Sequence, residues 1–181
     1  MPKRDKHSAE ERCNCLKHLV DVYESALLRY VSRLMGNPSF SEDIVQNTFI
    51  KLIHQWDGEL VPSPALSSWL YRVAHNETVD QIRRESKRKA LHAEHGQSDP
   101  SERPYQVPPG ETGLSDRAES AAEALEKLSD RERQLVVLKV YEEKSYKEIA
   151  EITGLTTGNV GFILHTAMKK LAAMLAKGGS R

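Results

Sequence analysis

Residues 146–163 read YKEIAEITGLTTGNVGFI, and this stretch decides the fold of the second half of the chain. A helix-turn-helix needs a small residue where two helices cross, a glycine at the turn, and apolar positions that hold the second helix on the first. Ala150, Gly154 and the pair Val160 and Ile163 meet these needs at the right spacing. The pattern describes packing rather than recognition, so a helical hairpin without a role in DNA binding stays open at this point.

Helical periodicity extends through the rest of the chain. Apolar residues recur at steps of three and four, strand-like alternation is absent, and a Pro- and Gly-rich stretch separates two helical parts. We therefore predict an all-α protein of two small helical domains, 1–92 and 115–181, joined by a flexible linker, 93–114. Such a linker predicts that the two halves move independently when free.

Short polar residues and prolines mark the expected helix starts. The predicted capping boxes are Ser8 with Glu11, Ser129 with Glu132, and Ser145 with Glu148. The first helix is expected to end near Met35, before a Gly-Asn-Pro break. Ser41 is expected to cap a second helix that ends at Gly58, and Pro64 is expected to open a third.

The formal net charge of the 181 residues is zero, but the charges are unevenly distributed. Residues 83–89 hold five bases and one acid, a net charge of +4, and residues 94–126 hold eight acids and two bases, a net charge of −6. Residues 168–181 hold four bases and no acid. Two basic patches therefore flank an acidic stretch, a distribution that is compatible with nucleic-acid binding despite the neutral total.

The third helix carries a second, independent sign of nucleic-acid binding. Trp69, Arg72, Asn76, Asp80 and Arg83 follow one another at steps of three, four, four and three, which places them on one helix face. An aromatic ring, an amide and a carboxylate suit unpaired bases, and guanidinium groups suit phosphates. The alternative is that Trp69 belongs to the core and that the cations solvate a helix end.

The sequence gives little support to other classes of protein. The first residues lack an apolar signal segment, and no apolar run approaches the roughly 20 residues that span a bilayer. We therefore expect a cytoplasmic protein without membrane insertion. No Gly-rich phosphate loop, nucleophile elbow or close cluster of His and acids is present, so we expect neither an enzyme nor a bound cofactor.

Cys13, Cys15 and His18, with His7 nearby, are residue types that bind zinc. On a helix, however, Cys13 and Cys15 point about 200° apart and cannot share a ligand face. We therefore expect ordinary thiols near the N-terminus and no metal site.

Four segments in the same order resemble the signatures of one protein family. They are EDIVQNTFIKL at 42–52, WLYRVAHN at 69–76, LSDRER at 128–133 and SYKEIAE at 145–151. These segments are similar to the successive signatures of extracytoplasmic-function sigma factors, a group within the sigma-70 family. The resemblance runs from about Leu19 to Leu175, apart from the linker. It implies an alternative sigma factor that binds core RNA polymerase and directs promoter recognition and transcription initiation.

The resemblance also implies roles for individual residues. The first half corresponds to region two, which docks on the clamp helices of the polymerase β′ subunit and melts the minus-ten element. The implied polymerase-binding residues are Asp43, Gln46, Asn47, Phe49 and Lys51. The implied minus-ten residues are Trp69, Arg72, Asn76, Asp80, Arg83 and Arg84. Asn76 falls where the family holds a base flipped out of the duplex.

The second half corresponds to region four, which binds the minus-thirty-five element and the β flap of the polymerase. The implied DNA-binding residues are Thr156, Thr157, Asn159, Phe162, His165, Thr166 and Lys169. Family members usually carry basic residues early in the second helix, whereas residues 161–166 read GFILHT. Bidentate reading of guanine by Arg is therefore unavailable there. The sequence leaves two alternatives open: Phe162 contacts a thymine methyl while His165 and Thr166 bond bases or phosphates, or a strong upstream contact is lost.

Two other functions stay open at the level of sequence. A helix-turn-helix transcription regulator with a helical sensor or protein-interaction domain would share the terminal motif but would not need the face from Trp69 to Arg84. An adaptor or anti-sigma protein, which binds only proteins, would need neither basic patch. For a sigma factor, the sequence does not decide whether an anti-sigma factor is a partner.

Overall fold

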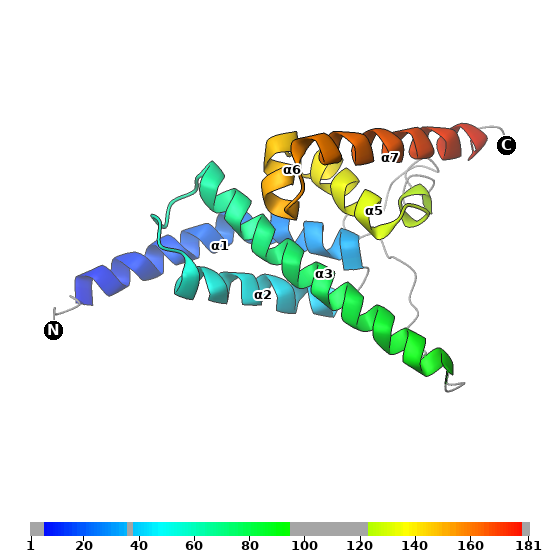
Figure 1. The fold of residues 1–181 in the computed structure, drawn as a ribbon. Helices are drawn as coiled ribbons and strands as arrows, with labels where there is room; N and C mark the ends of the chain where they lie inside the picture. Colours follow the sequence, from blue (N-terminus) through cyan, green and yellow to red (C-terminus); the bar gives the residue numbers. More distant parts are fainter. Residues whose placement is uncertain (1–5, 36–37, 95–122, 179–181) are drawn as a thin grey trace.

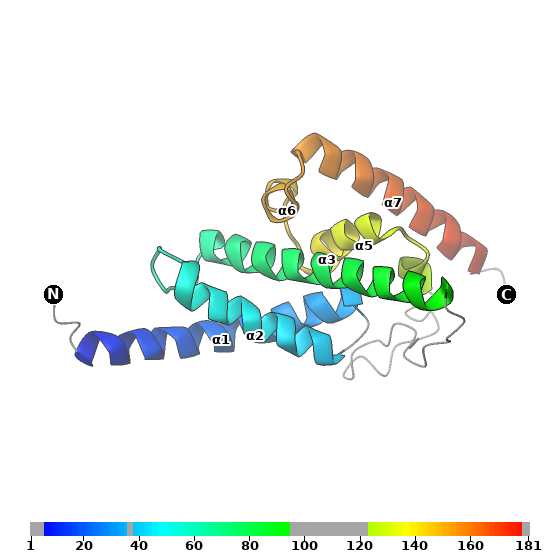
Figure 2. The ribbon, with the colours of Figure 1, turned by 60° about the horizontal axis from the view of Figure 1, so that its bottom comes forward.

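The computed structural model describes residues 6–35, 38–94 and 123–178, which form helices and, within these ranges, no strand. In chain order the elements are α1 (Lys6–Met35), α2 (Pro38–Gln55), α3 (Pro64–Glu94), α5 (Asp130–Val136), the π-helix η1 (Val137–Tyr141), α6 (Tyr146–Thr153) and α7 (Thr157–Gly178). The prediction of an all-α protein is confirmed. The helices form two layers: α1, α2 and α3 pack on one another, and α5, α6 and α7 lie on the other side of α3 (Figures 1 and 2).

The buried apolar side chains of the two layers form one continuous cluster. Leu27 of α1, Leu52 of α2 and Leu70 of α3 are almost fully buried in the first layer. Leu135 and Ile149 are buried in the second. Burial of one Leu or Ile side chain contributes about 1.5–3 kcal/mol, so this cluster is the main source of stability for both layers.

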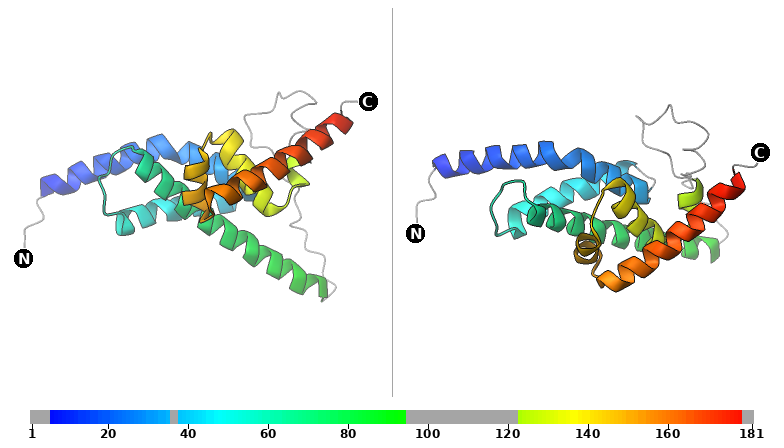
Figure 3. Two further views of the ribbon diagram at one scale, coloured as in Figure 1. Left: turned by 45° about the horizontal axis from the view of Figure 1, so that its top comes forward. Right: turned by 90° about the horizontal axis from the view of Figure 1, so that it is seen from above.

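The second layer diverges from the first beyond α6. The C-terminal ends of α3 and α7 point away from each other, whereas α6 lies close to the N-terminal half of α3 (Figure 3). The two halves therefore meet at α6 and the turn before it, and α5 and η1 also contact α1.

Three polar contacts hold the halves together at that turn. The Tyr71 hydroxyl of α3 donates to Oε2 of Glu142 at 2.5 Å, and Nη1 of Arg33 in α1 lies 3.7 Å from Oε1 of the same carboxylate. Nζ of Lys144 donates to the Ser67 hydroxyl at 3.1 Å. The two halves are therefore in contact in this arrangement, and their independent motion stays a prediction. The predicted linker, 93–114, lies outside the described residues except for its first two positions, which continue α3.

The helix starts confirm some sequence predictions and correct others. The capping boxes at Ser129 and Ser145 are both formed, and Pro64 opens α3. Helix α1 begins at Lys6, so Ser8 lies inside it and is not its cap. Helix α2 begins at Pro38, whose ring fixes a helical φ and whose missing N–H is not needed in a first turn. Ser41 is therefore inside α2 and buried, not a cap.

The end of α2 also differs from its prediction, because the helix stops at Gln55 and not at Gly58. Trp56 follows directly, and its indole Nε1 donates to the Glu59 carbonyl at 3.1 Å. A Cβ on Gly58 would lie 2.7 Å from the Trp56 ring. Gly58 thus allows the chain to fold tightly around this ring.

Candidate nucleic-acid interface

The predicted face of α3 is present on one continuous helix. Arg72, Asn76, Asp80 and Arg83 are exposed along it, and Trp69 is half-buried at its N-terminal end. The Arg83 guanidinium lies 3.6 Å from Oδ1 of Asp80, so these two charges are paired on the surface. Arg84 is exposed beside them. The helix thereby brings together all six residues that the sequence suggested for minus-ten DNA.

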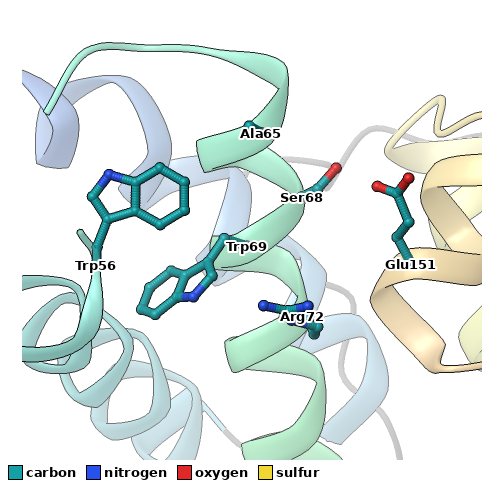
Figure 4. A pocket seen from close by; sticks show the side chains of 6 residues that line it. All are labelled: Trp56, Ala65, Ser68, Trp69, Arg72 and Glu151. Carbon is teal, nitrogen blue, oxygen red and sulfur yellow. The ribbon is translucent and has the colours of Figure 1, made fainter. Parts of the chain in front are cut away.

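An aromatic pocket forms at the Trp69 end of this face (Figure 4). Its cavity of about 260 Å³ is lined by Trp56, Ala65, Ser68, Trp69 and Arg72, and by Glu151 of α6. The rings of Trp56 and Trp69 meet edge to face with their centroids 5.7 Å apart. Sequence reasoning missed Trp56, because it lies beyond the end of a different helix and shares no period with α3.

The inner side of α3 is fixed by a buried histidine. His75 is only 2% exposed, and its Nδ1 lies at hydrogen-bond distance, 2.8 Å, from the Tyr30 hydroxyl oxygen of α1. Desolvation by burial lowers the pKa of His75 to about 4, and nearby Arg131 adds to the effect. Because His75 directly precedes Asn76, this contact orients the exposed face of α3 relative to α1.

The helix-turn-helix is formed by α6 and α7. Gly154 adopts the left-handed conformation with φ +70°, which a glycine tolerates best, and so turns the chain between the helices. Val160 and Leu164 are buried, and they hold α7 on the rest of the second layer. Hydrogen bonds from Ser145 lower the pKa of Glu148 and close the capping box of α6.

The predicted DNA-binding residues lie at the start of α7, directly before it and along its exposed side. Exposed side chains are Thr156, Thr157, Asn159, Phe162, His165 and Lys169. Thr166 differs, because its hydroxyl donates to the Phe162 carbonyl at 3.0 Å. Its proton is therefore engaged inside the helix.

The predicted polymerase-binding residues of α2 divide into two groups. Asp43, Gln46 and Asn47 are exposed. Phe49 is half-buried and packs against the core, and Lys51 forms an ion pair with Glu77 of α3.

The sequence reasoning did not include Ile50 in this surface and placed Ile53 on the apolar stripe of the helix, but the two side chains are 46% and 47% exposed on the same side of α2 as Gln46. Their spacing from Gln46, at steps of four and three, was the signal that could have found them.

Cys13 is exposed and Cys15 is half-buried on α1. Within the described ranges, no three His, Cys, Asp or Glu side chains group as a metal site would require. In the same ranges, no helix has both the length and the apolar character needed to cross a bilayer.

Two family models match the chain. Sigma-70 region 2 matches residues 19–88, and Sigma-70 region 4 matches residues 118–171. The ECF RNA polymerase sigma factor SigL of Mycobacterium tuberculosis is 30% identical over 167 residues, which cover 91% of this chain and 90% of SigL. The chain belongs to the extracytoplasmic-function sigma factors.

Further relatives agree with this assignment. The ECF RNA polymerase sigma factor SigW of Bacillus subtilis is 28% identical over 179 residues, covering 96% of this sigma factor and 95% of SigW. Among solved structures, the sigma factor RpoE in complex with the anti-sigma factor NepR from Bartonella quintana has a TM-score of 0.67 at 24% identity. That similarity covers 88% of this chain and 96% of RpoE, and it supports the fold.

The region 2 match includes most of α1, all of α2 and the face of α3, so the alternative of a sensor domain in the first half is excluded. The region 4 match includes α5, α6 and most of α7. Both candidate interfaces of this sigma factor therefore lie inside matched regions.

Proposed function

We propose that this sigma factor binds core RNA polymerase in the cytoplasm, carries it to promoters and opens the DNA there, without catalysing a reaction itself. The observation that carries the proposal is the pairing of two separate DNA-reading faces on one chain, the α3 face and the exposed side of α7. The proposed domains are region two over 1–92 and region four over 115–181, with 93–114 as the connection.

The α3 face is proposed to hold unpaired bases of the minus-ten element. Its aromatic pocket offers two indole rings for stacking, and Asn76 offers an amide that bonds to a base edge. Unpairing and flipping a base costs a few kcal/mol, which stacking and hydrogen bonds at this face offset. Arg72, Arg83 and Arg84 are placed along the helix to contact phosphates.

The exposed side of α2 is proposed to dock on the polymerase β′ clamp helices. Asp43, Gln46 and Asn47 supply polar contacts, and the exposed rims of Ile50 and Ile53 supply apolar area. Exposed aliphatic side chains between polar ones are typical of a protein interface. The region-four half is proposed to contact the β flap and the minus-thirty-five element.

The packed arrangement of the two halves is proposed to be the form without polymerase. Promoter elements about 25 base pairs apart are separated by roughly 85 Å of duplex at 3.4 Å per pair. Helix α6 lies directly against α3, so the two DNA-reading faces must separate before both elements are bound. An anti-sigma factor is a proposed partner of the packed form, in line with the similar fold of RpoE bound to NepR.

Run-off transcription with purified core polymerase tests the proposal. A promoter library should yield discrete transcripts only when this chain is added, and the start sites should share two upstream elements. The matched control is Asn14→Ala, an exposed position of α1 outside both faces and outside the contact between the halves, and it should give the wild-type transcripts. Absence of any promoter-dependent transcript with the wild-type chain would overturn the proposed function.

A further inference from the structure

One stripe of α7 lies opposite its buried side. Gly158, Phe162, His165 and Lys169 follow at steps of four, three and four, whereas Val160 and Leu164 face inward. Phe162 is 74% exposed, the largest fraction among the exposed large apolar side chains of the described residues. The stripe therefore presents one aromatic ring at its centre to whatever α7 binds.

The surroundings of the ring favour DNA over a protein. The other members of the stripe are a glycine, a histidine and a lysine, so the stripe itself offers no second apolar side chain beside Phe162. A protein interface of ordinary size needs an apolar patch, whereas a single ring matches the single apolar group that a base pair offers. Lys169 adds a positive charge at the other end of the stripe.

Gly158 has no explanation within the fold. It lies in a helix without a positive φ, and a Cβ at this position would meet nothing within 4 Å. A glycine in a helix costs about 0.5–1 kcal/mol relative to alanine. Its lack of a side chain does allow the first turns of α7 to approach an outside ligand closely.

The chemistry of the stripe restricts the base that it can read. No Arg or Lys lies between Val160 and Lys169, so the bidentate contact with guanine is missing. The Thr166 hydroxyl is engaged with the Phe162 carbonyl. In the major groove only thymine carries an exposed methyl group, and an aromatic side chain packs well against it.

We propose that Phe162 determines promoter specificity by packing against the C5-methyl group of a thymine in the upstream element. Lys169 lies about 10 Å further along the helix at 1.5 Å per residue, close to the width of the major groove, and contacts a phosphate at its edge. This inference rests on the proposed function, because it names the DNA that the region-four half reads.

Replacement of thymine by deoxyuridine tests the inference, since it removes only the methyl group. Upstream elements are first selected from a randomised library by transcription with the holoenzyme, and each selected thymine is then replaced on either strand. Wild-type holoenzyme should lose about fourfold in promoter binding at one position, the factor that corresponds to one buried methyl group. Phe162→Ala should bind the two promoters equally.

Met168→Ala is the matched control, because Met168 is exposed on α7 but lies off the stripe. This variant should keep the fourfold preference for thymine. Equal binding of thymine and deoxyuridine promoters by the wild type would overturn the inference, as would a preference that survives in Phe162→Ala. Loss of core binding in Phe162→Ala at an unchanged thymine preference would reassign the ring to a protein interface. If no library promoter is transcribed at all, the proposed function fails together with the inference.

Discussion

The proposed DNA-reading faces of α3 and α7 differ in charge and in exposure to solvent. The α3 face holds three arginines and two nearby indole rings, yet α6 lies beside its aromatic end and places Glu151 in the same pocket as Arg72 (Figure 4). The α7 face holds a lone exposed ring and one lysine, and its central residue is largely open to solvent. The face with more groups that can bind DNA, that of α3, is therefore the one whose access is limited by the second layer.

One buried carboxylate takes part in two of the three polar contacts between the halves. Glu142 follows η1, and its side chain is only 6% exposed between Arg33 and Tyr71. Both the burial and the hydrogen bond to this carboxylate raise the pKa of Tyr71. Lys144 lies 4.2 Å from the Tyr71 ring centroid and closes the cluster.

Of the changes considered, Glu142→Ala is expected to alter the difference in access between the α3 and α7 faces most. Removal of one partner from a buried ion pair typically costs about 3–5 kcal/mol, and here that loss falls on the contact between the halves. The α3 face should become accessible while the α7 face stays as it was. Hydrogen exchange should therefore rise at residues 65–72 and at α6, and small-angle scattering should show a more extended particle.

Glu143→Gln is the control for this change, because Glu143 is the next residue and is exposed. It should leave exchange and scattering unchanged. Identical scattering of Glu142→Ala and the wild type would show that the carboxylate does not hold the halves together.

A fall in pH should destabilise the packing of α3 before it affects α7. A histidine whose pKa is lowered from 6.5 to about 4 in the fold takes up a proton on unfolding, so its contribution is complete above pH 6.5 and is lost as the pH falls towards 4. From pH 7 to pH 5 the free energy of unfolding should fall by about 2 kcal/mol more in the wild type than in His75→Gln. His54→Gln, at an exposed position of α2, should keep the wild-type slope. Equal slopes for wild type and His75→Gln in chemical denaturation would contradict this role.

Ser145→Ala should cause the smallest loss of stability among these changes. The loss should affect both the α3 and the α7 face, because α6 contacts α3 and also α7. Loss of the capping box costs about 1 kcal/mol. Ser129→Ala removes the same kind of cap from α5 and is the matched comparison. Thermal unfolding should show a similar loss for both, whereas only Ser145→Ala should increase exchange at the N-terminal half of α3. Equal hydrogen exchange at the N-terminal half of α3 in the two variants would show that α6 does not limit access to the α3 face.

Local signals in the sequence predicted much of this fold. The boxes at Ser129 and Ser145 and the turn at Gly154 depend on residues within four positions of each other, and all three are formed. Ser41 was misleading because Pro38, three residues earlier, is an equally good helix start and the core then buried the serine. Local rules give no ranking between two such starts.

The contacts between the halves could not be predicted from sequence. Tyr71 and Glu142 are 71 residues apart, and neither follows a period that points to the other. The pocket beside Trp69 could not be predicted from sequence either, because Trp56 comes from a different segment and its ring packs against the turn at Gly58. The residues of the α3 face, by contrast, share one helix, so their spacing alone predicted their alignment.

Fluorescence of 2-aminopurine placed in the minus-ten element tests most directly whether the α3 face opens promoters. Holoenzymes carrying wild type, Asn76→Ala or the exposed-site control Asn14→Ala are compared at equal occupancy of core polymerase. Stacking and hydrogen bonds to one flipped base contribute about 1–3 kcal/mol, so Asn76→Ala should open the promoter at least roughly fivefold less, and Asn14→Ala should match the wild type. Opening by Asn76→Ala at the wild-type rate and extent would contradict the role of this face.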